Sequence, residues 1–188
     1  MLSNSLAILE SHPRPQSKRC GVMQTKQELE DWYNREDPWD YTVTPDDIYR
    51  KKFYLTVLDN LGSYDRALDI GAGEGFITKD LPAKEIHAIE LSDTAASRFP
   101  ESVERVFDPI GEYDLVLVTG LLYEQYDHLL IAKMALSAAS KHVCVGGIED
   151  WLLPYSFGRM IESYHFPYRE YDSVFNVYEY DDSVAWPL

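Results

Sequence analysis

A run of alternating glycines limits what this chain can fold into. Directly after a predicted apolar strand at residues 66–70, the sequence reads Leu68-Asp69-Ile70-Gly71-Ala72-Gly73-Glu74-Gly75. Glycines spaced in this way let the backbone turn tightly and approach a ligand closely, and a following helix offers its N-terminal amides. The dinucleotide fingerprint GxGxxG needs a glycine at position 76, where this chain has Phe76. The sequence therefore predicts a GxGxG turn that cradles a ligand at a strand end.

Strands and helices alternate regularly around this loop. Helices are predicted at 74–81, 92–99 and 127–139, and strands at 66–70, 85–90, 103–107, 113–119 and 142–148. Two further β-rich stretches follow at 168–174 and 175–181. This alternation indicates the α/β class, as a Rossmann-like, seven-stranded, mostly parallel sheet with helices on both faces. In such sheets the ligand lies outside the carboxyl ends of the strands.

The N-terminal segment is predicted to add helices above this sheet. Thr25 and Glu28 form a capping box for a helix at 25–33, and a second helix is expected at 45–60. We expect the N-terminal helices to form a lid. Residues 1–22 carry prolines and basic residues without apolar periodicity, which predicts a flexible arm ahead of a single domain at 23–188.

Two carboxylates lie at the predicted strand ends. Glu90 follows the second strand, nineteen residues after Gly71. A carboxylate at that place can accept hydrogen bonds from both hydroxyls of a ribose, and it repels a 2′-phosphate. Asp69 precedes the first glycine, where it can contact a charged amino-acid group directly or through water. The pattern therefore predicts a ligand with a ribose and a charged end.

This combination resembles the class I S-adenosylmethionine-dependent methyltransferases, whose first motif reads (D/E)xGxGxG. The resemblance covers residues 66–148 and implies that S-adenosylmethionine is the cofactor. It implies that the methionine part lies over Gly71 and Gly73, and that Leu91 flanks the adenine. It further implies that Asp108 lies near the adenine amino group. The cofactor-binding residues expected from the motif and from the strand ends are Asp69, Gly71, Ala72, Gly73, Gly75, Glu90, Leu91, Phe107, Asp108 and Thr119.

A second, narrower resemblance lies upstream. Asp37-Pro38-Trp39, followed by Tyr49-Arg50-Lys51-Lys52-Phe53, is similar to the DPW…YERxKY signature of methyltransferases related to the nodulation protein NodS. It implies that Trp39 covers the cofactor and that Arg50 pairs with the cofactor carboxylate. Core packing of an N-terminal helix is an equally open interpretation of Trp39. The segment after the fourth strand departs from this group, because Gly120 and Glu124 replace an acidic residue and a tyrosine.

Methyl transfer does not require a particular catalytic side chain, since much of the acceleration can come from positioning alone. An amine acceptor must nevertheless be neutral, so a nearby base would help. The candidates after the fourth strand are Tyr123, Glu124 and His128, for which surface exposure or helix capping is the alternative role.

The composition of the chain indicates which classes of binding partner to expect. A net charge of −15 disfavours nucleic acid, and no apolar run approaches the roughly 18 residues of a membrane helix, so a cytoplasmic location is expected. The cysteines form no Cys/His cluster, so no metal is expected.

We therefore expect methyl transfer to a nitrogen or oxygen of a small molecule, such as an amino sugar or natural product. The alternatives are a non-catalytic relative that binds the cofactor or a partner, and a nicotinamide-dependent oxidoreductase, which Phe76 disfavours. The sequence specifies no oligomeric state.

Overall fold

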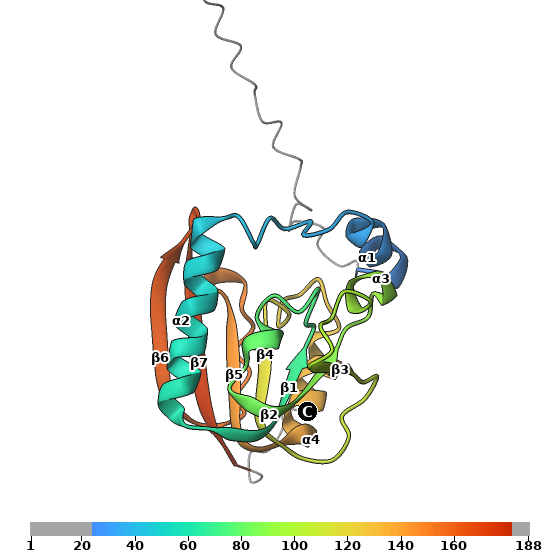
Figure 1. Ribbon diagram of the computed structural model, residues 1–188. Coiled ribbons are helices and arrows are strands. Elements are labelled where there is room, and N and C mark those ends of the chain that lie inside the picture. The colour runs from blue at the N-terminus through green and yellow to red at the C-terminus, as the bar shows by residue number, and fades with distance from the viewer. Residues whose placement is uncertain (1–23, 182–188) are drawn as a thin grey trace, which may run out of the picture.

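A seven-stranded sheet organises residues 24–181, the part of the chain that the computed structural model describes (Figure 1). The strand order is β3-β2-β1-β4-β5-β7-β6. The first five strands in the chain pair in parallel, whereas β7 runs antiparallel to both of its neighbours. The strands are β1 (Tyr64–Ile70), β2 (Ala83–Ile89), β3 (Val103–Arg105), β4 (Tyr113–Thr119), β5 (Ala139–Ile148), β6 (Gly158–Tyr168) and β7 (Tyr171–Tyr180). This confirms the predicted seven-stranded, mostly parallel α/β sheet.

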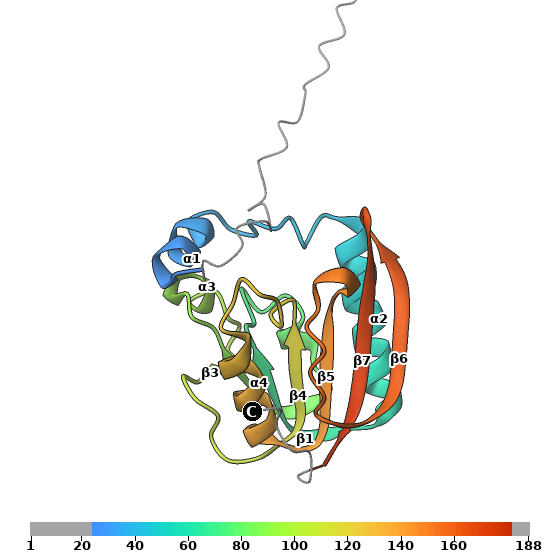
Figure 2. The ribbon, with the colours of Figure 1, turned by 180° about the vertical axis from the view of Figure 1, so that it is seen from behind.

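Helices cover both faces of the sheet, as predicted. The helix α2 lies on the face seen in Figure 1, and α4 lies on the face seen in Figure 2. Between α2 and the sheet, the side chain of Tyr54 stacks on Phe175 with ring centroids 4.0 Å apart. On the other face, Ala132 and Ala135 of α4 pack against buried valines of β4 and β5. The helical elements are α1 (Lys26–Tyr33), α2 (Pro45–Leu61), η1 (Thr78–Asp80), α3 (Asp93–Ala96), α4 (His128–Ala138) and η2 (Glu149–Trp151).

The N-terminal helices begin close to their predicted positions. In α1 the capping box is present, since Thr25 Oγ1 accepts from the Glu28 amide and the Glu28 carboxylate accepts from the Thr25 amide. In α2 the helix starts at Pro45, but Thr44 makes no side-chain capping bond. The action of these helices as a lid remains a prediction. The predicted arm at 1–22 and the expected domain start at Met23 lie outside the described residues.

The predicted helix at 74–81 is wrong. Only the short 3₁₀ turn η1 forms there. Gly75 adopts a left-handed conformation with φ of 77°, which interrupts a helix, and Pro82 follows directly after the segment. The stretch between them is shorter than two turns, too short to be stable as a helix without strong packing. The glycine loop is therefore followed by irregular backbone rather than by a helix N-terminus.

The C-terminal strands are also placed differently from the prediction. The two expected stretches at 168–174 and 175–181 are mostly one strand, β7, and β6 precedes them at Gly158–Tyr168. The strand β6 lies at the edge of the sheet, and of its side chains only Phe166 is buried, so the strand shows no clean apolar alternation. Arg169, with φ of 55°, makes the turn between the two strands. None of the helices within residues 24–181 is long and apolar enough to cross a bilayer.

Candidate active site

The glycine loop lies at the carboxyl end of β1 and is fixed to the neighbouring strand. The amides of Gly71 and Ala72 donate to the Ile89 carbonyl at 2.7 and 3.2 Å. Gly71 and Gly73 have φ of 77° and 58°, a region that favours glycine. A Cβ on Gly73 would lie 2.9 Å from the hydroxyl oxygen of Tyr33, so only glycine leaves room for this close approach.

Glu90 ends the adjacent strand and is tied directly to the loop. One carboxylate oxygen accepts from the Gly73 amide and the other from the Ser92 amide, each at 2.8 Å. The side chain is buried, and this burial raises the pKa of Glu90 while the backbone hydrogen bonds oppose the shift. Each carboxylate oxygen can accept more than one hydrogen bond, so Glu90 retains capacity for hydroxyl donors in the cavity that it lines.

Asp69 lies beneath the loop rather than in the cavity. Its Oδ2 atom accepts from the Thr78 hydroxyl at 2.6 Å, while Oδ1 is buried without a hydrogen-bond partner among residues 24–181. Desolvation raises the pKa of Asp69 to about 7, and the nearby charge of Glu90 adds to the increase. The sequence predicts that Asp69 contacts a charged group of the ligand. In the structure its carboxylate does not line the cavity.

A cavity of about 1030 Å³ opens over the carboxyl ends of the strands. This volume is at the upper end of the range for small-molecule sites, about 300–1,000 Å³. The predicted residues that line it are Trp39, Arg50, Gly71, Gly73, Glu90, Leu91, Phe107, Asp108, Thr119 and Tyr123. Asp69, Ala72, Gly75, Glu124 and His128 are not among its lining residues. The structure thus brings most of the predicted cofactor residues together, and only one of the three candidate bases.

The end of the cavity near β2 and β3 is open and partly apolar. Leu91 and Phe107 are 51% and 73% exposed there. Arg105 donates to the Glu90 carbonyl at 2.8 Å, and its guanidinium lies 4.7 Å from the centroid of the Phe107 ring. Arg105 therefore connects the backbone at Glu90 with the Phe107 ring.

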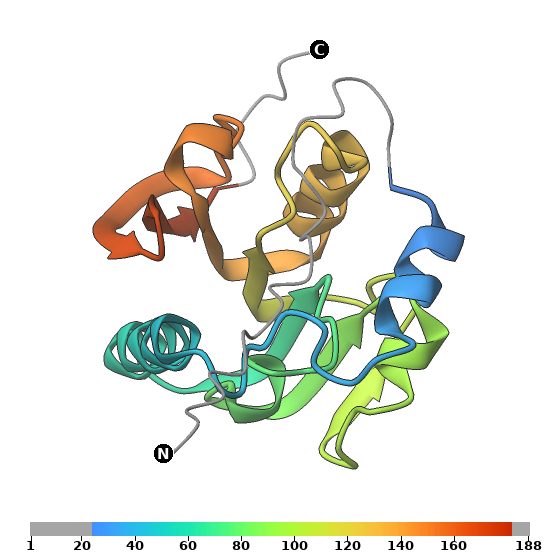
Figure 3. The ribbon, with the colours of Figure 1, turned by 90° about the horizontal axis from the view of Figure 1, so that it is seen from above.

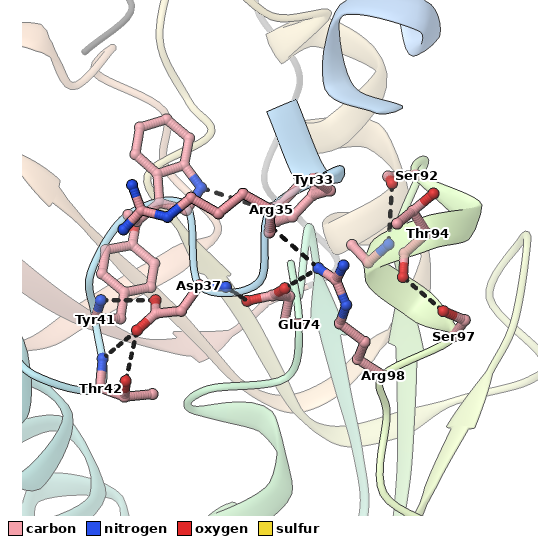
Figure 4. Close-up of polar contacts among 12 residues, drawn as sticks. Tyr33, Arg35, Asp37, Tyr41, Thr42, Glu74, Ser92, Thr94, Ser97 and Arg98 are labelled. Carbon is pink, nitrogen blue, oxygen red and sulfur yellow. Dashed lines mark hydrogen bonds and ion pairs between the residues drawn. The ribbon is translucent and has the colours of Figure 1, made fainter. Parts of the chain in front are cut away.

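The connector between α1 and α2 crosses above the sheet, as seen from above in Figure 3. Figure 4 shows how it is fastened to the glycine loop: the Asp37 amide donates to the Glu74 carboxylate at 2.8 Å. The Asp37 carboxylate in turn accepts from the amides of Tyr41 and Thr42 at 2.7 and 2.8 Å. Trp39 donates from Nε1 to the Tyr33 hydroxyl at 3.4 Å. The DPW segment therefore holds its own turn and places Trp39 at the cavity.

The three candidate bases differ in location. The Tyr123 hydroxyl accepts from the Ile148 amide at 2.7 Å, and burial raises the pKa of this tyrosine above its usual value. Glu124 is exposed to solvent outside the cavity. His128 begins α4 and shares a hydrogen bond of 2.6 Å between its Nδ1 atom and the Tyr155 hydroxyl. Tyr123 therefore reaches the cavity as a neutral hydroxyl, and the other two side chains do not line it.

Sequence reasoning missed a buried charged cluster at the opposite end of the cavity. We call it the Asp47 cluster: Asp47, Arg50 and Arg169, with the rings of Tyr41 and Tyr168. Asp47 pairs with Arg50 at 3.0 Å and with Arg169, and it accepts from the Tyr168 hydroxyl at 2.6 Å. The Arg50 guanidinium lies 5.0 and 5.1 Å from the centroids of the two tyrosine rings. No spacing in the sequence could signal a pair 122 positions apart.

Comparisons with known proteins agree with this architecture. No family model matches the sequence. A highly reducing polyketide synthase, VdtX from Byssochlamys spectabilis, is 30% identical over 124 residues, covering 58% of this chain and 6% of that protein. The N-methyltransferase NodS from Bradyrhizobium japonicum, solved with S-adenosylhomocysteine, superposes with a TM-score of 0.70 at 17% identity, covering 82% of this chain and 97% of its own.

A second solved structure shows the same arrangement. The magnesium protoporphyrin IX methyltransferase from Synechocystis, solved with S-adenosylmethionine, superposes with a TM-score of 0.59 at 11% identity. The superposition covers 86% of this chain and 99% of that enzyme. The strand order and the position of the glycine loop agree with the resemblance seen in the sequence. The chain therefore has the fold of the class I S-adenosylmethionine-dependent methyltransferases, and NodS is among the structures that share it.

Proposed function

We propose that this chain is an enzyme that transfers a methyl group from S-adenosylmethionine to a nitrogen or oxygen atom of a small molecule, an amino sugar or another natural product. The observation that carries the proposal is the bond between Glu90 and the Gly73 amide. This bond joins a ribose-type carboxylate and a glycine cradle at neighbouring strand ends. The shared fold with two methyltransferases supports the same activity.

The residues at this end of the cavity fit the cofactor. The left-handed Gly73 brings the loop backbone against the Tyr33 hydroxyl, where a Cβ would be crowded, and Glu90 has capacity for two ribose hydroxyls. We assign the adenine to the apolar surface of Leu91 and Phe107, and its amino group to Asp108. Thr119 and Trp39 would border the methionine part, and Arg50 would pair with its carboxylate. When bound, the cofactor supplies an electrophilic methyl group on a positively charged sulfur.

The protein's own contribution is positioning and exclusion of water. A buried, oriented pair of reactants can gain about 7–11 kcal/mol from proximity. Tyr123 is neutral at physiological pH because burial raises its pKa, so it acts as a hydrogen-bonding group rather than as a base. Its oxygen already accepts from the Ile148 amide, which leaves the hydroxyl proton available to orient an acceptor atom.

Aromatic side chains on the remaining wall favour a planar or sugar-like acceptor. Tyr123 and Trp151 meet edge to face with ring centroids 6.0 Å apart, and Trp151 packs on Tyr171 at 4.9 Å. Tyr126 also lines this side. Flat ring faces bind sugars, aromatic groups and cations. The partial match to a polyketide synthase supports a natural product as the acceptor.

Calorimetric titration with S-adenosylmethionine, S-adenosylhomocysteine and NAD tests the proposal. We expect micromolar binding of the first two ligands and none of NAD, because Phe76 occupies the third glycine position of the NAD fingerprint. Binding of NAD alone would identify an oxidoreductase instead. Binding of none of the three would contradict a cofactor-dependent activity.

A non-catalytic relative is the second candidate. It is favoured by Gly120, which replaces the acidic residue of the NodS group, and by the absence of Glu124 and His128 from the cavity lining. Formation of S-adenosylhomocysteine with any acceptor in a screen of amino sugars and phenolic natural products would eliminate it. Binding of the cofactor without turnover across that screen would favour it.

A further inference from the structure

The Asp47 cluster carries more positive than negative charge in a buried place. The Asp47 side chain is fully buried, and the side chains of Arg50 and Arg169 are each 10% exposed. Two guanidinium groups therefore share one carboxylate. The carboxylates of Asp46 and Glu170 lie next to the cluster but are exposed to solvent, where screening weakens them.

Hydrogen bonding in the cluster is incomplete as well. The Nε atoms of Arg50 and Arg169 are both buried without a hydrogen-bond partner in the part of the chain that the structure describes. Tyr41 and Tyr168 offer their ring faces to Arg50, which compensates the charge only in part. A buried charge without a full set of partners is costly, so this corner of the cavity favours an additional anion.

The position of the cluster identifies which ligand would supply the anion. Arg169 lies in the turn between β6 and β7, and β7 is four strand positions from β2, where Glu90 lies. At a strand spacing of about 4.8 Å this is about 19 Å. In S-adenosylmethionine, six bonds join the ribose ring to the carboxylate, and they span about 8 Å. A cofactor whose ribose is held by Glu90 can therefore reach the cluster only with its carboxylate, at Arg50, and leaves Arg169 to the second ligand.

The cofactor's own charge strengthens this assignment. At neutral pH it carries one carboxylate but two positive groups, an ammonium and a sulfonium. Pairing of its carboxylate with Arg50 would therefore add net positive charge to the cavity rather than remove it. A second ligand with a negative charge would offset part of this positive charge.

We infer that Arg169, oriented by Asp47, binds a carboxylate of the methyl acceptor. The inference rests on the proposed function and adds the chemical class of the substrate: a small molecule with a carboxylic acid and a ring-shaped body. A carboxylate matches the fork of a guanidinium and carries a single charge, equal to the excess in the cluster.

Benzoate and benzamide are suitable probes because they have the same shape and differ in charge. We would titrate each into the protein saturated with S-adenosylhomocysteine and follow binding by NMR. The wild-type protein should bind benzoate at least tenfold more tightly than benzamide. Arg169→Gln should reduce this preference to less than threefold and leave the affinity for S-adenosylhomocysteine within twofold. Arg159→Gln is the matched control, because Arg159 lies on the same hairpin with a 72% exposed side chain.

Two results would overturn the inference. One is equal binding, or no binding, of benzoate and benzamide by the wild-type protein, a comparison that needs no variant. The other is a tenfold loss of S-adenosylhomocysteine affinity in Arg169→Gln with unchanged affinity for 5′-methylthioadenosine, which lacks the amino-acid carboxylate. That pattern would assign the anion to the cofactor. Failure of the wild-type protein to bind S-adenosylhomocysteine at all would instead contradict the proposed function.

Discussion

The two ends of the cavity are built in different ways. At the end formed by β1 and β2, the cavity is built on the backbone of the glycine loop, which is held by one carboxylate that lies 17 positions along the chain from Gly73. At the end formed by α2 and the β6–β7 turn, the surface consists of side chains that come from as far apart as Trp39 and Arg169. The first end is a local product of two adjacent strands. The second exists only after the whole domain has folded.

This difference has consequences for substitution and for specificity. A backbone cradle changes little when neighbouring side chains vary, so it suits a cofactor that stays the same. A cluster of long side chains changes its shape and charge with each substitution, so it suits recognition of a particular acceptor. The hydrogen bond from Arg169 to the Trp39 carbonyl, at 3.4 Å, links this cluster to the connector above the cofactor end.

The largest expected effect concerns Asp69 at the cofactor end. Its pKa is about 7 in the folded protein, against about 3.9 in an unfolded chain. Between these values the folded state binds the proton and the unfolded state does not. The free energy of unfolding should therefore decrease as pH rises from about 4 to about 7, and then level off. At about 1.4 kcal/mol per pKa unit, the contribution amounts to a few kcal/mol.

Asp69→Asn should remove this part of the pH dependence and keep an acceptor for Thr78. Urea unfolding of both proteins between pH 4.5 and 8 measures the difference, in which the other titrating groups cancel. Equal slopes would show that Asp69 is ionised in the fold. The cofactor end of the cavity would then carry a negative charge on Asp69 in addition to that on Glu90.

Glu90→Ala should weaken binding of S-adenosylhomocysteine by about 1–3 kcal/mol, because it removes a charged acceptor and frees the amides of Gly73 and Ser92. Glu90→Gln should cost less, since an amide oxygen can still accept. Calorimetry gives both values, and thermal melting checks the fold. Wild-type affinity in a folded Glu90→Ala protein would mean that the ribose is held elsewhere. The assignment of Glu90 to the cofactor and of Arg169 to the acceptor would then no longer be supported.

A smaller effect is expected where α1 is fastened to the cofactor end. The Glu30 carboxylate accepts from the Ser92 hydroxyl at 2.9 Å and from the amides of Asp93 and Thr94 at 2.6 and 3.1 Å. These bonds lower the pKa of Glu30 to about 2, so the contact should persist in mildly acidic solution. Glu30→Ala should increase hydrogen exchange in α1 and weaken S-adenosylhomocysteine binding slightly.

Gln27→Ala provides the control for Glu30, because Gln27 bonds only within the same helix, to Asp31 at 2.9 Å. Exchange in α1 that is equally slow in both variants would show that other contacts hold the helix. The lid role of α1 would then need a different anchor.

The sequence predicted most of the cofactor end and little of the other. The glycines, Glu90 and the five parallel strands are encoded in short segments, so local spacing and apolar runs reveal them. The edge strand β6 escaped prediction because only Phe166 in it is buried and its other side chains are exposed or half-buried, which blurs the alternation on which the prediction relies. The helix predicted at 74–81 failed because the left-handed Gly75 interrupts it. The pairing of Asp47 with Arg169 is a tertiary contact, which no local pattern encodes.

The smallest effects are expected for two of the three candidate bases. Glu124 is exposed and His128 bonds to Tyr155, and neither lines the cavity. Glu124→Gln and His128→Ala should therefore change the rate of S-adenosylhomocysteine formation by less than twofold. The stability should change by about 0.5 kcal/mol at most for Glu124→Gln and by about 1 kcal/mol for His128→Ala, which loses the bond to Tyr155. Tyr123→Phe is the informative comparison, since it removes the hydroxyl that reaches the cavity and also leaves the Ile148 amide without its acceptor. A rate loss of tenfold in the Glu124 or the His128 variant, with Tyr123→Phe unaffected, would mean that the acceptor enters beside α4. The Asp47 cluster would then be a structural tie between α2 and the β6–β7 turn.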